Sequence, residues 1–208
     1  MKSALIVDDH PVVRAAVKIV LQIEGFKEIH EAASGNEVVP LIREHAPELV
    51  ILDLRLPALD GLDVLARIRA NAFDCRIVVF TSHDPLFYQE RCVRAGAMAF
   101  VSKTKDLEQL KKAIQAVMAK YTYFSALADS TGVLNPLLVT EKQLIDQLSD
   151  RELNIFEQLG QGKSNKAIAI NMNLSHKTVS TYKTRLMKKL GVSSAVHLRD
   201  FAKRNHLI

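Results

Sequence analysis

The first 122 residues alternate five times between a short apolar run and a helical pattern, and this alternation limits the fold more than any other feature. Apolar runs of this length are typical of strands that are buried on both faces of a parallel sheet. Five such units predict a flavodoxin-like α/β domain whose five parallel strands have the order 2-1-3-4-5. The expected strands are 3–7, 27–32, 49–52, 76–80 and 98–101, and the expected helices are 11–24, 35–46, 61–71, 86–95 and 106–121.

Local signals support several of these helix boundaries. Pro11 suits the first turn of a helix, where its missing N–H costs nothing. Ser34 and Asp60 are predicted N-caps. Pro40 conflicts with the second helical pattern, and we expect it to kink that helix or to delay its start.

Acidic residues follow two of the apolar runs. Asp8 and Asp9 follow the first run, and Asp53 follows the third. The carboxyl ends of parallel strands form the ligand-binding edge of such a sheet, so we expect the three carboxylates to converge there. They would repel one another without a cation, and oxygen ligands of this kind suit Mg²⁺. A simpler interpretation is that Asp8 and Asp9 only cap the first helix.

Two further strand ends carry groups that suit a phosphoryl ligand. The hydroxyl of Thr81 can bond a phosphoryl oxygen, and the ammonium of Lys103 can pair with phosphate. Either residue alone has an ordinary explanation, since Lys103 could be a surface lysine. Together with a carboxylate nucleophile at Asp53, they predict a pocket that handles phosphoryl groups.

Over residues 1–122 the chain resembles the receiver domain of two-component response regulators. The resemblance rests on Val7-Asp8-Asp9-His10, Leu52 through Pro57, Phe80-Thr81-Ser82, and Ala95-Gly96-Ala97 leading to Lys103. It implies that a sensor histidine kinase donates phosphate to Asp53, and that Thr81 and Lys103 bind the phosphoryl oxygens. It also implies that Phe100 takes the place of a switch tyrosine. The implied Mg²⁺ ligands are Asp9, Asp53 and the carbonyl of Arg55, with Asp8 acting through water.

The alternation stops after residue 122. Residues 123–148 contain a cluster of Ser, Asp, Gly, Asn and Pro, which predicts a linker with a short helix near 140–147. From Ser149 onward the pattern is helical, with Ser149 and Glu152 spaced as a capping box and with Ser164 and Ser175 as further N-caps. The expected helices of this all-α domain, residues 149–208, are 150–160, 165–172, 176–190 and 194–204.

Positive charge is concentrated in this last segment. Residues 149–208 carry 11 Lys or Arg against 4 Asp or Glu, whereas residues 1–122 carry 16 of each. A basic excess of this kind favours binding to a polyanion through counterion release. An ordinary solvated basic face is the simpler alternative.

The helix over 176–190 has the composition of a DNA-reading helix. Val179, Leu186 and Leu190, and Tyr182 in part, recur at helical spacing and are expected to face the core. A tight turn precedes the helix, which predicts a helix-turn-helix. An amphipathic surface helix is the alternative. The residues expected to face DNA are Lys177, Ser180, Thr181, Lys183, Thr184, Arg185 and Lys188.

This segment resembles the LuxR-type DNA-binding domain of the NarL/FixJ family, closest to its BvgA/EvgA branch. The resemblance rests on Leu148 through Glu152, Gly162 through Ala169, and Ser175 through Leu190. It implies a transcription regulator that binds promoter DNA as a homodimer when phosphorylated, with RNA polymerase as a further partner.

The resemblance also implies that the dimer forms through the first and fifth receiver helices, with the fourth and fifth as the alternative. The fifth helix has more apolar surface than one buried face needs. The apolar residues expected to provide this surface are Leu107, Leu110, Ala113, Ile114 and Val117.

Several classes of protein fit this sequence less well. No apolar run approaches the roughly 18 residues of a membrane span. Acidic residues come too early for a signal peptide. Cys75 and Cys92 form no disulfide framework, which favours reduced thiols in the cytoplasm. The seven histidines show no metal-binding spacing, so no metal site is predicted on them.

Two alternative functions remain. A phosphatase of the haloacid dehalogenase type also uses an aspartate at a strand end, but it normally has a second carboxylate two residues later, where this chain has Arg55. We therefore expect no enzyme beyond the receiver's own phosphoryl transfer and dephosphorylation. The other alternative is a DNA-binding protein whose receiver is never phosphorylated, against which the complete set of pocket residues argues.

Overall fold

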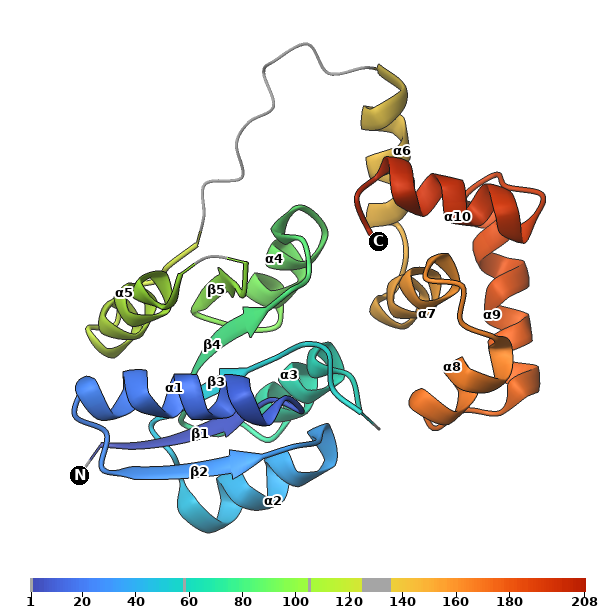
Figure 1. Cartoon of the computed structure of the whole chain (residues 1–208). Coiled ribbons are helices and arrows are strands. Elements are labelled where there is room, and N and C mark those ends of the chain that lie inside the picture. Colours follow the sequence, from blue (N-terminus) through green and yellow to red (C-terminus); the bar gives the residue numbers. More distant parts are fainter. Residues whose placement is uncertain (1, 58, 105, 125–135) are drawn as a thin grey trace. The chain divides into compact units, whose positions relative to one another are not determined.

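The computed structural model describes residues 2–57, 59–104, 106–124 and 136–208, and the chain divides into two compact units, Met1–Leu127 and Ala128–Ile208. The first unit is a parallel sheet of five strands in the order β2-β1-β3-β4-β5, flanked by helices (Figure 1). The predicted strand order is therefore confirmed. The strands are β1 (Ser3–Val7), β2 (Glu28–Ala32), β3 (Leu49–Leu52), β4 (Arg76–Thr81) and β5 (Ala99–Ser102).

A helix follows each strand. One hydrophobic core lies between the sheet and α1 and α5, and it contains Ile6, Ile51 and Phe80 from the strands together with Leu21 and Leu110 from those helices. The remaining helices, α2 to α4, cover the other face (Figure 1). The helices of this unit are α1 (Pro11–Ile23), α2 (Gly35–His45), α3 (Gly61–Ala70), α4 (Pro85–Arg94) and α5 (Leu107–Met118).

The register of the sheet brings the carboxyl ends of its strands to one edge. Val7 pairs with both Ala32 and Leu52, and Thr81 pairs with Ser102. Because the paired strands end level, the residues that follow Val7 and Leu52 emerge side by side. This register is what places the functional side chains at a common edge.

Helix α2 differs from expectation at two points. Pro40 lies inside the helix and does not delay its start at Gly35. It is exposed, so water can bond the carbonyl that loses its N–H partner. Ser34 is the N-cap residue, but its hydroxyl donates to the Glu37 carboxylate, 2.5 Å away, instead of accepting a backbone N–H.

The second unit consists of the helices α6 (Pro136–Asp146), α7 (Asp150–Gly160), α8 (Asn165–Asn171), α9 (His176–Lys189) and α10 (Ala195–Arg204). Helix α6 begins four residues before the short helix that was expected at 140, because a proline can open a helix without losing a bond. The Glu141 carboxylate accepts hydrogen bonds from Arg204 and Asn205, both at 2.7 Å. Part of the predicted linker is thus a helix that packs against the end of α10.

Serine side chains cap the starts of four helices in this unit, α7 to α10. Ser149 and Glu152 form the predicted capping box, with the Glu152 N–H donating to Ser149 Oγ and the Ser149 N–H donating to the Glu152 carboxylate. Ser164 caps α8 and Ser175 caps α9, as predicted. Asn173, in the turn between α8 and α9, has a φ of 52°, a conformation that asparagine tolerates better than most residues.

The cysteines and the helix lengths agree with an ordinary globular fold. Both thiols are free, and burial, aided by the charge of Asp74, raises the pKa of Cys75 to about 11. Cys75 is therefore protonated and unreactive at neutral pH. Within the described ranges, no helix has the length and apolar character needed to cross a membrane.

Candidate phosphoryl site and nucleic-acid interface

The predicted acidic residues meet at the carboxyl edge of the sheet. Backbone hydrogen bonds continue the sheet beyond the strand ends: the Asp53 N–H donates to the Val7 carbonyl at 2.9 Å, and the Asp8 N–H donates to the Ala32 carbonyl at 3.1 Å. Asp8 and Asp53 are 3% and 2% exposed. Two carboxylates are therefore held next to one another and shielded from water, which is unfavourable unless a cation compensates them.

Lys103 is a cation in contact with both of these carboxylates. Its Nζ lies 2.6 Å from Asp8 Oδ2 and 2.5 Å from Asp53 Oδ2. The Lys103 N–H also donates to the Thr81 carbonyl at 2.8 Å, which fixes the backbone from which the side chain reaches in. The interpretation of Lys103 as a solvated surface lysine is therefore wrong, because its ammonium lies between two buried acids.

Asp9 and His10 complete the acidic pocket. His10 Nδ1 lies 2.6 Å from Asp9 Oδ1, and the His10 N–H donates to Asp8 Oδ1 at 2.9 Å. Potential ligand atoms of Asp8, Asp9, His10 and Asp53 lie within 4.8 Å of one another. This carboxylate-rich set fits a hard divalent cation such as Mg²⁺. His10 was not among the predicted site residues, although its position next to two acids was a usable signal.

The loop after Asp53 depends on Gly61. The Gly61 N–H donates to the Leu54 carbonyl at 2.9 Å, which folds the loop back on the end of β3. A Cβ at this position would lie 2.4 Å from Leu54 Cα and 2.5 Å from the Asp53 carbonyl oxygen. Only glycine permits this approach. The Arg55 N–H donates to Asp53 Oδ1 at 3.2 Å, while a metal-binding role for the Arg55 carbonyl stays a prediction.

Thr81 and Phe100 belong to the same edge of the sheet. Thr81 is fully buried at the end of β4, and its hydroxyl accepts the His83 N–H at 3.4 Å. The His83 ring stacks on Tyr88 of α4, with 4.2 Å between ring centroids. Phe100 in β5 is buried as well. The elements thus place Thr81 beside Lys103, and the role of Phe100 as a switch stays a prediction.

Helix α9 presents the predicted polar face to solvent. Val179, Leu186 and Leu190 are buried and Tyr182 is half-buried, as expected. Of the seven residues predicted to face DNA, Lys183 is half-buried and the other six are exposed. All seven are therefore accessible to a partner.

The two threonines on this face already use their hydroxyl protons. Thr181 Oγ1 donates to the Lys177 carbonyl at 3.0 Å, and Thr184 Oγ1 donates to the Ser180 carbonyl at 3.1 Å. Each can still accept a hydrogen bond and offers a methyl group. A hydrogen-bond acceptor can recognise the amino group of adenine or cytosine, and a methyl group can contact the methyl group of thymine.

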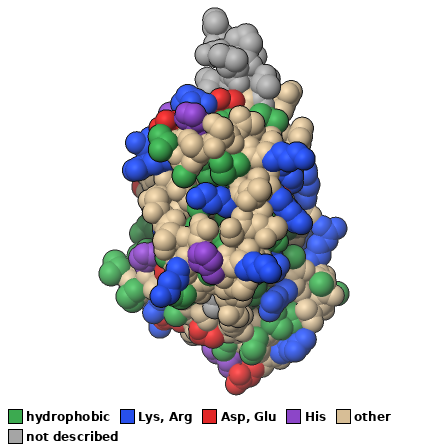
Figure 2. Space-filling model, turned by 90° about the vertical axis from the view of Figure 1, so that its right-hand side faces the viewer, with side chains coloured by type: hydrophobic (Ala, Val, Ile, Leu, Met, Phe, Trp, Pro, Cys, Tyr) green, Lys and Arg blue, Asp and Glu red, His purple; other side chains and the backbone are tan. Residues whose placement is uncertain are grey.

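A pocket next to α9 adds basic residues that were not predicted individually from the sequence. Its lining includes Lys183 of α9, and further Lys and Arg side chains come from the start of α8 and from α10. Figure 2 views the molecule from the side on which α9 lies in Figure 1, and it shows many Lys and Arg side chains with few acidic ones between them. The basic excess of the last 60 residues is the sequence signal that indicated such additional basic residues. The additional residues are Lys163, Lys166, Arg199 and Lys203.

Lys189, another basic residue of α9, forms an ion pair with α7. Its Nζ lies 2.7 Å from the Glu152 carboxylate, and this ion pair joins α9 to the capping box of α7. Burial alone would raise the pKa of Glu152, but the hydrogen bonds from Lys189 and Ser149 outweigh it and lower that pKa. The pair therefore helps to hold α9 on α7.

Models of two protein families match the chain. The response regulator receiver domain matches residues 4–115, and the luxR family of bacterial regulatory proteins matches residues 146–202. The two matches cover the two compact units in turn.

Known proteins resemble the chain over nearly its full length. BvgA of Bordetella pertussis, named as a transcription regulator of virulence factors, is 45% identical over 99% of this chain and 98% of its own. The DNA-binding transcriptional activator EvgA of Escherichia coli is 34% identical over 99% of both chains. Among solved structures, RcsB of Salmonella enterica, bound to a promoter in the presence of a phosphomimetic, has the same fold, with a TM-score of 0.68 and 20% identity over 98% of this chain and 99% of that one.

Proposed function

Because this chain belongs to the response regulators with a LuxR-type DNA-binding domain, we propose that phosphate taken up on Asp53 controls the binding of promoter DNA through α9. The observation that carries the proposal is the contact of Lys103 with both buried carboxylates, Asp8 and Asp53. The family is one of transcription regulators, so the phosphatase alternative is set aside. The proposal is tested by measuring the affinity of the chain for promoter DNA with and without a small phosphodonor.

The proposed reaction uses Asp53 as the nucleophile. A carboxylate oxygen of Asp53 attacks the phosphorus of a phosphohistidine on a sensor kinase, the P–N bond breaks, and the departing histidine nitrogen keeps the electron pair. The product is an acyl phosphate on Asp53. Lys103 can then shift from the carboxylates to a phosphoryl oxygen, because its ammonium already lies within bonding distance of the reacting group.

The pocket would hold Mg²⁺ through Asp9 and Asp53, with Asp8 acting through water and with the Arg55 carbonyl as a further ligand. A bound Mg²⁺ supplies positive charge against the phosphoryl oxygens. The arrangement of the carboxylates supports this assignment, since oxygen donors of Asp8, Asp9 and Asp53 lie together at one edge.

Replacing Lys103 with alanine is expected to uncouple phosphorylation from DNA binding. Asp53 should still accept phosphate, but the phosphoryl oxygen loses its charge-assisted bond, worth about 1.5–3 kcal/mol. The increase in DNA affinity that phosphate produces in the parent chain should then fall by roughly ten- to a hundredfold. Fluorescence anisotropy with a labelled promoter duplex measures it. The control is Lys27→Ala, an exposed lysine of the same unit. An undiminished response in Lys103→Ala would assign the coupling to another group.

We further propose that phosphorylation promotes a homodimer through α1. Surplus apolar surface on α5 is not available for this purpose, because four of the five apolar residues expected to provide it are buried in the core. The expectation of such a surplus is therefore wrong. The buried residues are Leu110, Ala113, Ile114 and Val117.

The exposed apolar residues lie on α1 instead. Val12, Ile19 and Ile23 are 80%, 58% and 68% exposed. Their spacing of seven and four residues puts them along one side of the helix. This side of α1 is the surface that we propose for the dimer.

Ile19→Asp is expected to weaken the phosphorylated dimer by about 2 kcal/mol, roughly thirtyfold in dissociation constant. A buried charge without a partner opposes association across this face. Sedimentation of the phosphorylated chain measures the change. Val93→Asp is the matched control, since Val93 is 45% exposed on α4, a helix of the alternative dimer face. A dimer that survives Ile19→Asp and is absent in Val93→Asp would establish the alternative.

The proposal also includes the partners of the chain, its location and its domain bounds. The kinase is a cognate sensor histidine kinase, RNA polymerase is a further partner at the promoter, and the chain acts in the cytoplasm. We propose residues 1–122 as the receiver domain and residues 149–208 as the DNA-binding domain, joined by residues 123–148, which include α6. The solved RcsB, bound to promoter DNA, supports the DNA-binding assignment only as a protein of the same fold.

A further inference from the structure

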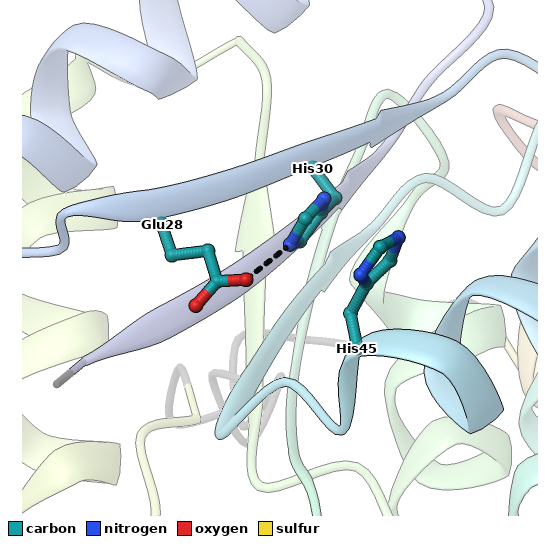
Figure 3. A group of neighbouring side chains, drawn as sticks. All are labelled: Glu28, His30 and His45. Carbon is teal, nitrogen blue, oxygen red and sulfur yellow. Dashed lines mark hydrogen bonds and ion pairs between the residues drawn. The ribbon is translucent and has the colours of Figure 1, made fainter.

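A second cluster of potential metal ligands lies between β2 and the end of α2. Glu28 and His30 are two residues apart on β2, so their side chains leave the same face of the strand. His45 is the last residue of α2 and lies beside them (Figure 3). One ligand atom from each of the three residues lies within 4.8 Å of the others. Sequence spacing missed this cluster, because His45 lies fifteen positions after His30 and only the fold brings it beside the other two residues.

The side chains are in direct contact. Glu28 Oε1 lies 3.1 Å from His30 Nε2, and the His30 and His45 rings stack with 3.6 Å between centroids and 8° between planes. The His30 and His45 side chains are 23% and 24% exposed. The cluster is therefore partly desolvated but open on one side, through which an ion and its water ligands can enter.

We propose that Glu28, His30 and His45 bind one divalent transition-metal ion such as Zn²⁺, which fastens edge strand β2 to the end of α2. Two imidazoles and one carboxylate are the ligand types that suit Zn²⁺ and its neighbours in the first transition row, whereas Mg²⁺ prefers oxygen. Three protein ligands leave a position for water. One ring must turn out of the stack to point at the ion, and this torsion of histidine has a broad energy minimum.

The site is separate from the phosphoryl pocket. Glu28 pairs with Ser3, the first residue of β1, and His30 pairs with Leu5 in the middle of that strand. Asp8 and Asp53 follow the opposite, carboxyl ends of their strands. Binding should thus stabilise the receiver unit without requiring Asp53, and the inference does not depend on the proposed function.

The test is calorimetric titration of the full chain with Zn²⁺, in excess Mg²⁺ and at mildly alkaline pH where imidazole is neutral. We expect one Zn²⁺ whose affinity falls at least about tenfold in His30→Gln and in His45→Gln, since even loss of an outer partner of a ligand costs ten- to a hundredfold. The matched control is His10→Gln, a histidine of the acidic pocket, which should keep this ion. Zn²⁺ should also raise the thermal unfolding midpoint of the parent chain but of neither cluster variant.

Three results would overturn the proposal: no Zn²⁺ binding, equal binding by all variants, or binding abolished in His10→Gln and kept in His45→Gln. The last result would place the ion in the acidic pocket. Glutamine keeps the size and polarity of these half-buried side chains, and thermal unfolding in the presence of a chelator establishes that each variant is folded. If the His30→Gln variant is destabilised, the binding of Zn²⁺ by the His45→Gln variant, which alters the end of α2, decides the question.

Discussion

Asp53→Asn is expected to abolish phosphorylation of this chain completely. The amide lacks the charge and the nucleophilic oxygen of the carboxylate, while it keeps the size of the side chain and can still accept the Arg55 N–H. Mass spectrometry after incubation with a small phosphodonor and Mg²⁺ should find one phosphoryl group on the parent chain and none on the variant. The rise in DNA affinity on addition of phosphodonor should disappear with it.

The matched control for this experiment is Asp74→Asn, which lies before β4, at the opposite edge of the sheet from Asp53. It should be labelled like the parent chain. Asp9→Asn, which alters the acidic pocket but keeps the nucleophile, should slow labelling without removing the site. If Asp53→Asn were labelled as fully as the parent chain, Asp53 would not be the phosphoacceptor.

Substitutions on α9 are expected to divide into two kinds of DNA-binding defect. Thr181 and Thr184 can each accept a hydrogen bond and offer a methyl group. Their replacement by alanine should therefore alter the preference between duplex sequences, by about 1–3 kcal/mol for each base that the side chain reads. Replacement of Lys183 or Lys188 should weaken binding to all sequences alike. It should also lower the slope of log affinity against log salt by roughly 0.9 for each phosphate that is no longer neutralised.

Competition binding of the phosphorylated chain, with specific and random duplexes at several salt concentrations, separates the two kinds of defect. Lys166→Ala, in the neighbouring basic pocket, should behave like the lysine variants of α9. Lys27→Ala is the control for total charge, because Lys27 belongs to the first unit. If no substitution on α9 changed either affinity or preference, another surface would bind the DNA.

Only part of the phosphoryl pocket could be predicted from the residues at the strand ends. Asp8, Asp9, Asp53, Thr81 and Lys103 could be predicted to share one edge, because the carboxyl ends of parallel strands always do. The contact of Lys103 with both Asp8 and Asp53 could not be predicted, because it depends on how a flexible side chain reaches between two others. The contact of His10 with Asp9 was missed, although the two residues are neighbours in the sequence.

The buried faces of the helices could likewise be predicted only in part from the sequence. Periodicity identified Val179, Leu186 and Leu190 as one buried face, since a helix repeats every 3.6 residues whatever it packs against. It could not decide how many apolar residues the core would take up. The core covers the apolar side of α5 and leaves Ile19 and Ile23 of α1 exposed, which reverses the expected source of surplus apolar surface.

What the sequence by itself determined is the set of strands and helices, the capping serines of the second unit and the set of strand-end residues, because each follows from local periodicity or from a residue's place in its own element. The strand order followed from the five alternating units, which favour one arrangement of a parallel sheet. Tertiary structure alone decided which distant side chains meet. Lys189 pairs with Glu152, and His45 stacks on His30, because the packing of separate elements brings them together. Such contacts depend on the rotation and separation of whole helices and strands, which no repeat along the chain encodes.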